Sequence, residues 1–250
     1  MKCFVASKYV IFLCFLTAFS HANNANLTQQ NQEFSVILGA SRIIYTPGSK
    51  GQIVPVLNEQ DYPMLVQTQV TADDEGTDVP TGRFSAVPPL FRLDGQQRAK
   101  VRIVHTGGHL AADRESLYWV CVKGIPPSGD DSWADGQAPE SATLMVQMMI
   151  NNCIKLLVRP KALAGQNALV MAERLRWQRG PEGLTAVNDS PFYINLSALT
   201  VGGKAVEQVR HIAPFASHTF ALPAGASGEV QWRALSDLGG EGPLLSAPLP

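Results

Sequence analysis

The chain has 250 residues, which is enough for two domains of ordinary size. Hydrophobic residues make up 45% of it and charged residues 16%, so the chain can bury a core and is not a disordered polyelectrolyte. The formal net charge of −1 excludes the basic excess that is typical of a general nucleic-acid-binding protein. The 21 glycines and 17 prolines favour many short elements joined by turns over long helices.

The N-terminal end has the parts of a secretory signal peptide. Lys2 and Lys8 supply a basic start, residues 9–19 are apolar, and small residues close the segment. A membrane-spanning helix needs about 20 apolar residues, so this run is too short for one. We therefore predict a signal peptide over residues 1–22, cleaved after Ala22, and export of the remaining chain.

Short strands are expected after a polar leader, residues 23–33, which we expect to be mobile. Lys100 and Arg102 alternate with Val101 and Ile103, which is the period of a strand with one face in solvent. Turn residues bound this strand and its neighbours. The expected strands of this half are 34–38, 42–45, 52–57, 64–70 and 100–105.

A long run without Gly or Pro extends over residues 144–158, whereas a usual strand has about five or six residues. Its Leu and Met residues also suit a helix, and the cysteines decide between the two. After signal cleavage Cys121 and Cys153 remain, and two cysteines in an exported protein indicate one disulfide. Neighbouring antiparallel strands bring Cα atoms to the required distance of about 5.5 Å. We therefore predict a hairpin of strands 117–122 and 144–158.

The loop between these strands, residues 126–141, contains acidic but no basic residues and is expected to be solvated. Closing a loop of about 33 residues should stabilise the fold by roughly 3–4 kcal/mol. Between Leu144 and Cys153 the long strand has no Pro and no charge, although proteins usually protect a free strand edge with such residues. Either the edge is covered within its own sandwich, or it donates or receives a strand.

The second half of the chain again contains short strands, beginning near Leu169. Pro160 ends the strand ladder of the first half, so the boundary between domains is expected there. We predict an all-β fold with domains at residues 34–160 and 161–250. No catalytic, nucleotide or metal motif is present, so we expect no enzyme activity, metal, cofactor, small-molecule substrate or nucleic-acid partner. The clearest strands of this half are 187–196, 219–222 and 229–235.

Residues 110–127, LAADRESLYWVCVKGIPP, resemble the signature segment of periplasmic pilus-assembly chaperones. Further segments of the chain resemble the same family, so the resemblance covers most of the mature chain. It implies two immunoglobulin-like β-sandwich domains with a cleft between them, and a location in the periplasm. The cysteine pair and the long acidic loop resemble the branch that assembles thin or capsule-like surface fibres. The other similar segments are 86–93, 154–160, 188–193 and 236–240.

The resemblance implies a function in fibre assembly. In this family the chaperone donates its edge strand to a pilus or fimbrial subunit that lacks the last strand of its own sandwich. The subunit is then delivered to an outer-membrane usher. The alternative is a structural fibre subunit or adhesin, although residues 23–33 are too polar to act as a donor arm. The positions that match the donor face are Leu144, Val146, Met148 and Ile150.

Two further sets of residues match functional positions of the family. Arg42 and Lys155 match the pair that anchors the C-terminal carboxylate of the subunit, and such a pair supplies charge-assisted hydrogen bonds. Without the resemblance, each would be a solvated surface charge. The second set matches an ion network that sets the angle between the domains, and it consists of Glu115, Arg159 and Asp237.

Overall fold

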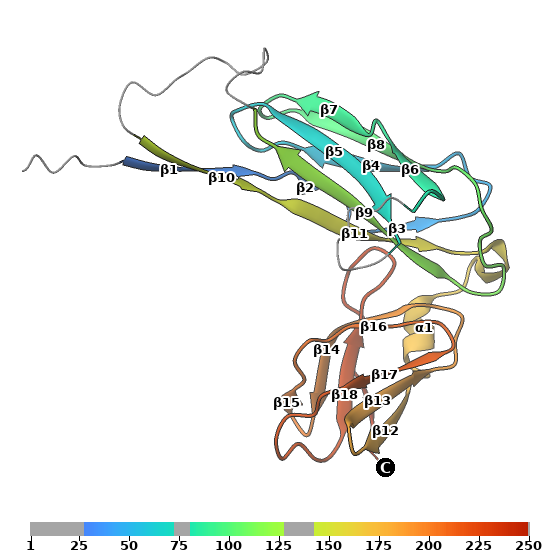
Figure 1. The fold of residues 1–250 in the computed structure, drawn as a ribbon. Helices are drawn as coiled ribbons and strands as arrows, with labels where there is room; N and C mark the ends of the chain where they lie inside the picture. The colour runs from blue at the N-terminus through green and yellow to red at the C-terminus, as the bar shows by residue number, and fades with distance from the viewer. Residues whose placement is uncertain (1–27, 73–80, 128–142, 250) are drawn as a thin grey trace, which may run out of the picture.

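The computed structural model describes residues 28–72, 81–127 and 143–249, and the predicted signal peptide and most of the acidic loop lie outside these ranges. Figure 1 shows two β-rich domains that follow one another along the chain and are set at an angle. Each domain has its own cluster of buried hydrophobic residues. Within the described ranges, neither helix has the length and apolarity that a membrane-spanning helix requires.

Two sheets pack face to face in the first domain (Figure 1). One has the order β3-β11-β9-β5-β7, and the other has the order β2-β4-β8-β6. The strands of the first sheet are β3 (Arg42–Tyr45), β11 (Asn151–Val158), β9 (Ser116–Ile125), β5 (Met64–Thr71) and β7 (Leu90–Leu93). Those of the second are β2 (Ile37–Leu38), β4 (Gln52–Leu57), β8 (Arg98–His105) and β6 (Phe84–Val87).

The first core lies between these sheets and follows the period of two seen in the sequence. On β8, Val101 and Ile103 are fully buried, whereas Lys100 and Arg102 face solvent. From the opposite sheet Val120 and Leu156 are also fully buried. Because alternate side chains of a strand point to opposite faces, this pattern confirms the strand predicted there.

The long strand is divided into β10 (Thr143–Met149) and β11, with Ile150 between them. We predicted one uninterrupted strand, and the division occurs where the strand changes partner. Ile150 donates its N–H to the carbonyl of Phe34 and accepts a hydrogen bond from the N–H of Gly124. Beyond this point β11 pairs antiparallel with β9, and Cys153 lies opposite Cys121. The predicted disulfide between these two cysteines is present.

The N-terminal strand β1 (Thr28–Phe34) pairs in parallel with β10. Residues 28–33 of the expected leader thus belong to a strand, whereas residues 23–27 lie outside the described ranges. The strand forms despite its polar sequence, because pairing with β10 provides hydrogen-bond partners for its backbone N–H and C=O groups, and this pairing does not depend on the side chains. Tyr62 also fixes its end, since its hydroxyl accepts from the N–H of Glu33 and donates to the carbonyl of the same residue.

The second domain contains a sheet of order β12-β13-β17 and a second sheet around β14. In the second sheet β15, β14, β18 and β19 follow one another, and β16 also pairs with β14. The first sheet contains β12 (Arg176–Gly180), β13 (Gly183–Asn188) and β17 (Ala216–Phe220). The second contains β14 (Ile194–Val201), β15 (Lys204–Ala205), β16 (His211–Ile212), β18 (Val230–Ala234) and β19 (Leu245–Ala247).

Two expectations for the second domain were wrong. A short 3-10 helix, η1 (Lys161–Leu163), and the helix α1 (Ala168–Ala172) occupy the region where strands were expected to begin. Asn167 starts α1 because its side chain accepts a hydrogen bond from the N–H of Leu169. The strand expected over 187–196 is interrupted by a turn, since the Asn188 amide donates to the carbonyl of Phe192.

We expect Cys153→Ala to lower the free energy of unfolding by about 3–4 kcal/mol, because it removes the cross-link that restricts the unfolded chain. Urea unfolding of the purified protein measures this change. Cys121→Ala should cause a similar loss, and the double variant should lose little more than either single variant, because all three lack the same bond. Unchanged unfolding of all three variants would contradict the stabilising role.

Candidate functional site

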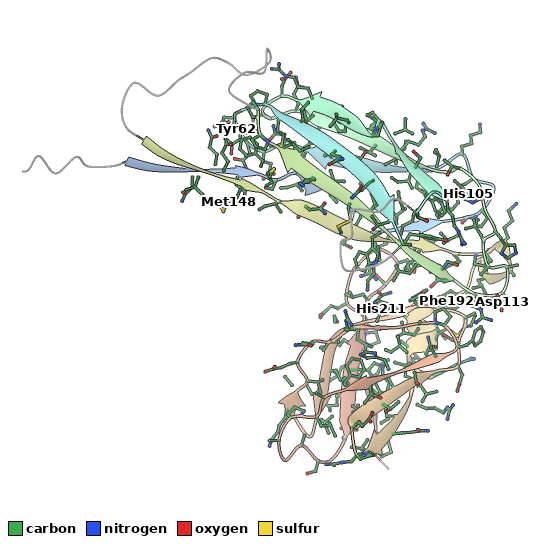
Figure 2. All side chains as sticks on the ribbon, in the orientation of Figure 1. Tyr62, His105, Asp113, Met148, Phe192 and His211 are labelled. Atoms are coloured by element: carbon green, nitrogen blue, oxygen red, sulfur yellow. A yellow bond between two sulfur atoms is a disulfide. The ribbon has the colours of Figure 1, made fainter. Side chains whose placement is uncertain are left out.

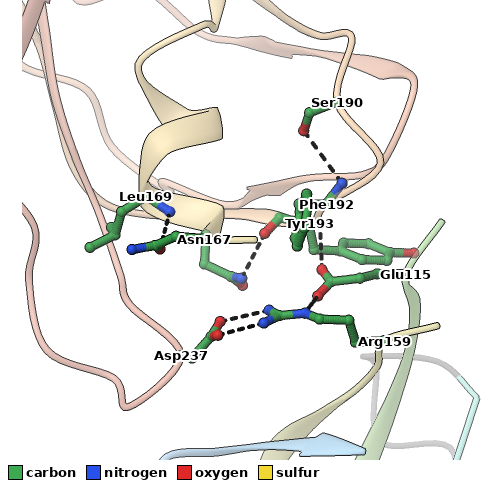
Figure 3. Close-up of polar contacts among 9 residues, drawn as sticks. Glu115, Arg159, Asn167, Leu169, Ser190, Phe192, Tyr193 and Asp237 are labelled. Carbon is green, nitrogen blue, oxygen red and sulfur yellow. Dashed lines mark hydrogen bonds and ion pairs between the residues drawn. The ribbon is translucent and has the colours of Figure 1, made fainter. Parts of the chain in front are cut away.

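An ion network joins the two domains (Figure 3). Arg159, just after β11, donates from Nε to Glu115 Oε1 at 2.7 Å and from Nη1 and Nη2 to the Asp237 carboxylate at 2.6 and 2.7 Å. Glu115 also accepts from the N–H of Tyr193 at 2.8 Å, and its own N–H donates to the carbonyl of Pro191. The structure therefore brings together the three residues that the sequence predicted as a network.

The network is charged although it is largely removed from solvent. The Glu115 side chain is fully buried, and burial raises the pKa of its carboxyl group, against the opposing effects of the Tyr193 N–H and Arg159. Burial disfavours the charged form of Arg159, but its hydrogen bonds to Asp237 and Glu115 outweigh this effect and raise its pKa. The Arg159 guanidinium, which also lies 5.1 Å from the centre of the Phe192 ring, therefore stays charged between its two carboxylates.

We expect Asp237→Asn to lower the free energy of unfolding by about 1–2 kcal/mol, because it weakens a bidentate, charge-assisted contact. The loss of stability should be moderate, since the Asp237 side chain is 35% exposed to solvent. Asp94→Asn is the matched control, because Asp94 pairs with Arg92 where both side chains are exposed. Urea unfolding should show little change for the control, and an equal change in both variants would contradict a special contribution of the network.

Arg42 and Lys155 lie side by side at the end of the first domain that faces the second. They are register partners in the parallel pairing of β3 with β11, so their side chains leave neighbouring strands together. Arg42 is half-buried, and burial lowers its pKa while the nearby Asp237 carboxylate opposes that shift. Its Nε atom is buried without a hydrogen-bond partner among the residues that the structure describes. The site thus contains a buried donor without an acceptor.

The Lys155 ammonium reaches residues of the second domain. Its Nζ donates to Asn195 Oδ1 at 2.6 Å and lies 3.3 Å from His211 Nδ1. It also lies 5.6 Å from the centre of the Trp119 ring on β9. Asn195 and His211 were not predicted as site residues from the sequence, because a lone Asn and a scattered His carry no motif. Only the packing of the domains brings them to Lys155.

The predicted donor segment extends away from the sheets of the first domain together with β1 (Figure 1). Val146 and Ile150 are half-buried, and Met148, labelled in Figure 2, is 45% exposed. Leu144 is part of β10, but its side chain lies outside the described set. Met149, on the opposite parity, is 55% exposed, so both faces of this strand present apolar side chains.

The register with β1 distinguishes these two faces. Met149 is the partner of Phe34, which is buried in the first core, and Met148 is the partner of Glu33. Partners in neighbouring strands share a face, so Met149 lies on the face that continues the core and Met148 on the other. Val146 has the parity of Met148, in agreement with the predicted grouping of the donor side chains. Which face a partner would cover stays a prediction.

Two family descriptions match most of the chain. Residues 35–164 match the pili and flagellar-assembly chaperone, PapD N-terminal domain, and residues 170–245 match the pili assembly chaperone PapD, C-terminal domain. The chain is 50% identical over 207 residues to the chaperone protein AfaB of Escherichia coli, covering 81% of this chain and 82% of AfaB. It is 42% identical over 225 residues to the chaperone protein caf1M of Yersinia pestis, covering 86% of each.

Solved structures show the same two-domain fold. The Escherichia coli chaperone DraB, at 47% identity, superposes with a TM-score of 0.76 over 89% of this chain and all of DraB. The SafB chaperone in its complex with the Salmonella enterica SafA pilin, at 40% identity, gives a TM-score of 0.78 over 89% of this chain and 100% of that one. The predicted pair of immunoglobulin-like domains is thus confirmed. Since both domains match in sequence and in fold, the chain belongs to the family of pili assembly chaperones.

Proposed function

We propose that the chain binds a pilus or fimbrial subunit in the periplasm by adding β10 to the subunit's incomplete sandwich, and then passes the subunit to an outer-membrane usher. The observation that carries this proposal is the apolar strand β10, which extends beyond the main sheets and continues into the strand of Lys155. The SafB chaperone, similar to this chain, is itself seen in complex with a pilin. The family match favours this function over that of a fibre subunit or adhesin.

The edge of β10 supports strand addition. In the described part of the chain β10 pairs only with β1, so one row of its backbone N–H and C=O groups has no neighbouring strand. Such an edge readily pairs with another chain. The donor face that we propose projects at intervals of about 6.6 Å, matching pockets left by a missing strand. It consists of Leu144, Val146, Met148 and Ile150.

Arg42 and Lys155 are proposed to hold the C-terminal carboxylate of the bound subunit. The pairing of the half-buried Arg42 with Lys155 supports this role, because cations on neighbouring strands can share one carboxylate. At about 3.3 Å per residue, Lys155 lies about 23 Å along the strand from Met148. A subunit strand of about eight residues would therefore reach from the donor region to the basic pair.

The remaining parts of the proposal concern export and domain arrangement. Residues 1–22 would direct export, and the domains would extend over residues 34–160 and 161–250. The network of Glu115, Arg159 and Asp237 would hold the angle between the domains, since it joins the residues just before β9 and just after β11 to the second domain. In this arrangement the second domain would form one wall of the site around Lys155.

The proposal is tested by co-expressing the chain with the neighbouring genes that encode exported proteins and purifying it from the periplasm. We expect the chain to be recovered in a one-to-one complex with a small exported β protein, which is then identified by mass spectrometry and serves as the subunit in later experiments. The chain should be absent from purified surface fibres. Its incorporation into the fibres as a stoichiometric component would contradict the proposal and support a structural role.

A further inference from the structure

Two residues of the second domain meet the Lys155 ammonium from adjacent strands. Asn195 on β14 and His211 on β16 are register partners in an antiparallel pair, so their side chains lie next to each other. Figure 2 shows His211 at the end of the second domain that faces the first. Lys155 extends from β11 across the junction to both of them, at 2.6 Å from Asn195 Oδ1 and 3.3 Å from His211 Nδ1.

The orientation of both partners is fixed by other contacts. Asn195 is 4% exposed, and its Nδ2 donates to the carbonyl of Tyr193, which turns Oδ1 toward the ammonium. The main-chain carbonyl of Asn195 accepts from the N–H of Leu235 at 2.7 Å. The His211 ring packs at 5.5 Å from the Tyr193 ring. Because an ammonium only donates hydrogen bonds, His211 Nδ1 must be the acceptor in its contact with Lys155.

Neutral acceptors hold a cation without cancelling its charge. A carboxylate at position 195 would form an ion pair with Lys155 and compete with any incoming carboxylate, whereas the Asn195 amide leaves the net charge of the ammonium in place. A lysine side chain is also flexible, and a group that is already held in position loses less freedom when it binds. The two contacts therefore hold the ammonium of the register partner of Arg42, and neither of them adds a negative charge beside it.

We infer that Asn195, with His211, positions the Lys155 ammonium for the C-terminal carboxylate of the subunit. The anchor then includes residues of the second domain and depends on how the two domains are joined. This inference rests on the proposed function, because it assigns positioning residues to the proposed carboxylate site.

The test uses sodium acetate as a carboxylate probe and acetamide as its neutral counterpart, at constant ionic strength. The NMR signal of the Lys155 ammonium in the ¹⁵N-lysine-labelled protein, assigned with Lys155→Ala, measures binding directly. In the wild-type protein the signal should shift with acetate to saturation and respond little to acetamide. Asn195→Asp and Asn195→Leu should each weaken acetate binding at least tenfold, the former because it supplies an internal carboxylate.

The histidine is tested by two substitutions and a matched control. His211→Leu should weaken acetate binding severalfold, whereas His211→Asn should largely preserve it, because the amide can place an acceptor where Nδ1 lies. His218→Leu is the control, since His218 is on β17 of the same domain and packs on Phe220. It should leave acetate binding unchanged. If losing any histidine of the second domain weakened binding by loosening that domain, His218→Leu would weaken it as well.

The outcomes separate this inference from the proposed function. If the wild-type signal does not respond saturably to acetate, the carboxylate anchor itself is wrong, and the inference is overturned with it. If the wild-type protein binds acetate and Asn195→Leu binds it within twofold of that affinity, the anchor stands and the positioning role is overturned. Asn195→Asp would compete with acetate whatever the native role of Asn195. If Asn195→Leu does not fold, Asn195→Ala, which removes the acceptor without adding a charge, therefore decides the question.

Discussion

Lys155→Ala or Arg42→Ala should abolish capture of the co-purified subunit while the chain remains folded. The two cations are neighbours on β3 and β11, and a carboxylate between them would be held by charge-assisted hydrogen bonds. Removing one partner of such a contact costs about 2–5 kcal/mol of binding. At the upper end this exceeds a thousandfold loss of affinity. The amount of complex recovered from the periplasm, at equal expression of the chaperone, measures the effect.

Lys100→Ala is the matched control for this experiment. Lys100 is an exposed lysine on β8, in the other sheet of the first domain, so its removal tests the loss of a positive charge outside the site. Complex formation should remain at the wild-type level. If both anchor variants also gave wild-type amounts of complex, Arg42 and Lys155 would not be the carboxylate anchor. Thermal unfolding of each variant separates loss of binding from loss of fold.

Val146→Asp or Met148→Asp should prevent complex formation altogether. Each apolar side chain that fills a subunit pocket should contribute roughly 1.5–3 kcal/mol, less the cost of ordering the strand. An aspartate would lose this contribution and would also have to be desolvated inside the groove. In the free chain Met148 is 45% exposed, so the substitution should have little effect on the stability of the chaperone itself. Recovery of complex from co-expressing cells provides the measurement.

Gln147→Asp is the control for the donor face, because Gln147 is exposed and has the opposite parity on the same strand. It should reduce complex formation less than the two aspartates at positions 146 and 148. Equal losses at all three positions would show that charge disrupts the strand as a whole. A greater loss at position 147 would shift the register by one residue, and the donor face would then consist of Met145, Gln147 and Met149.

The three residues of the ion network could be predicted from the sequence, whereas the contacts that surround them could not. Arg159 follows a recognisable strand end, and Glu115 and Asp237 lie in segments that resemble the family. Their distances, and the partly buried hydrogen bond from the Tyr193 N–H to Glu115, depend on the packing of the second domain against the first. The donor strand was recognised by its length and lack of charge, but its pairing with a polar N-terminal strand was missed.

Elements with a local signal could be predicted from the amino-acid sequence alone. The alternation around Val101 and Ile103 indicates a strand with one buried face, and the two cysteines that remain after the predicted signal peptide, Cys121 and Cys153, indicate the disulfide that the structure contains. The pairing of β1 with one edge of β10 could not be predicted in this way, because backbone pairing does not depend on the polarity of the side chains. Only the tertiary structure brings Asn195 and His211 to Lys155, since hydrogen bonds between residues 40 and 56 positions apart arise from packing and leave no periodic pattern in the chain.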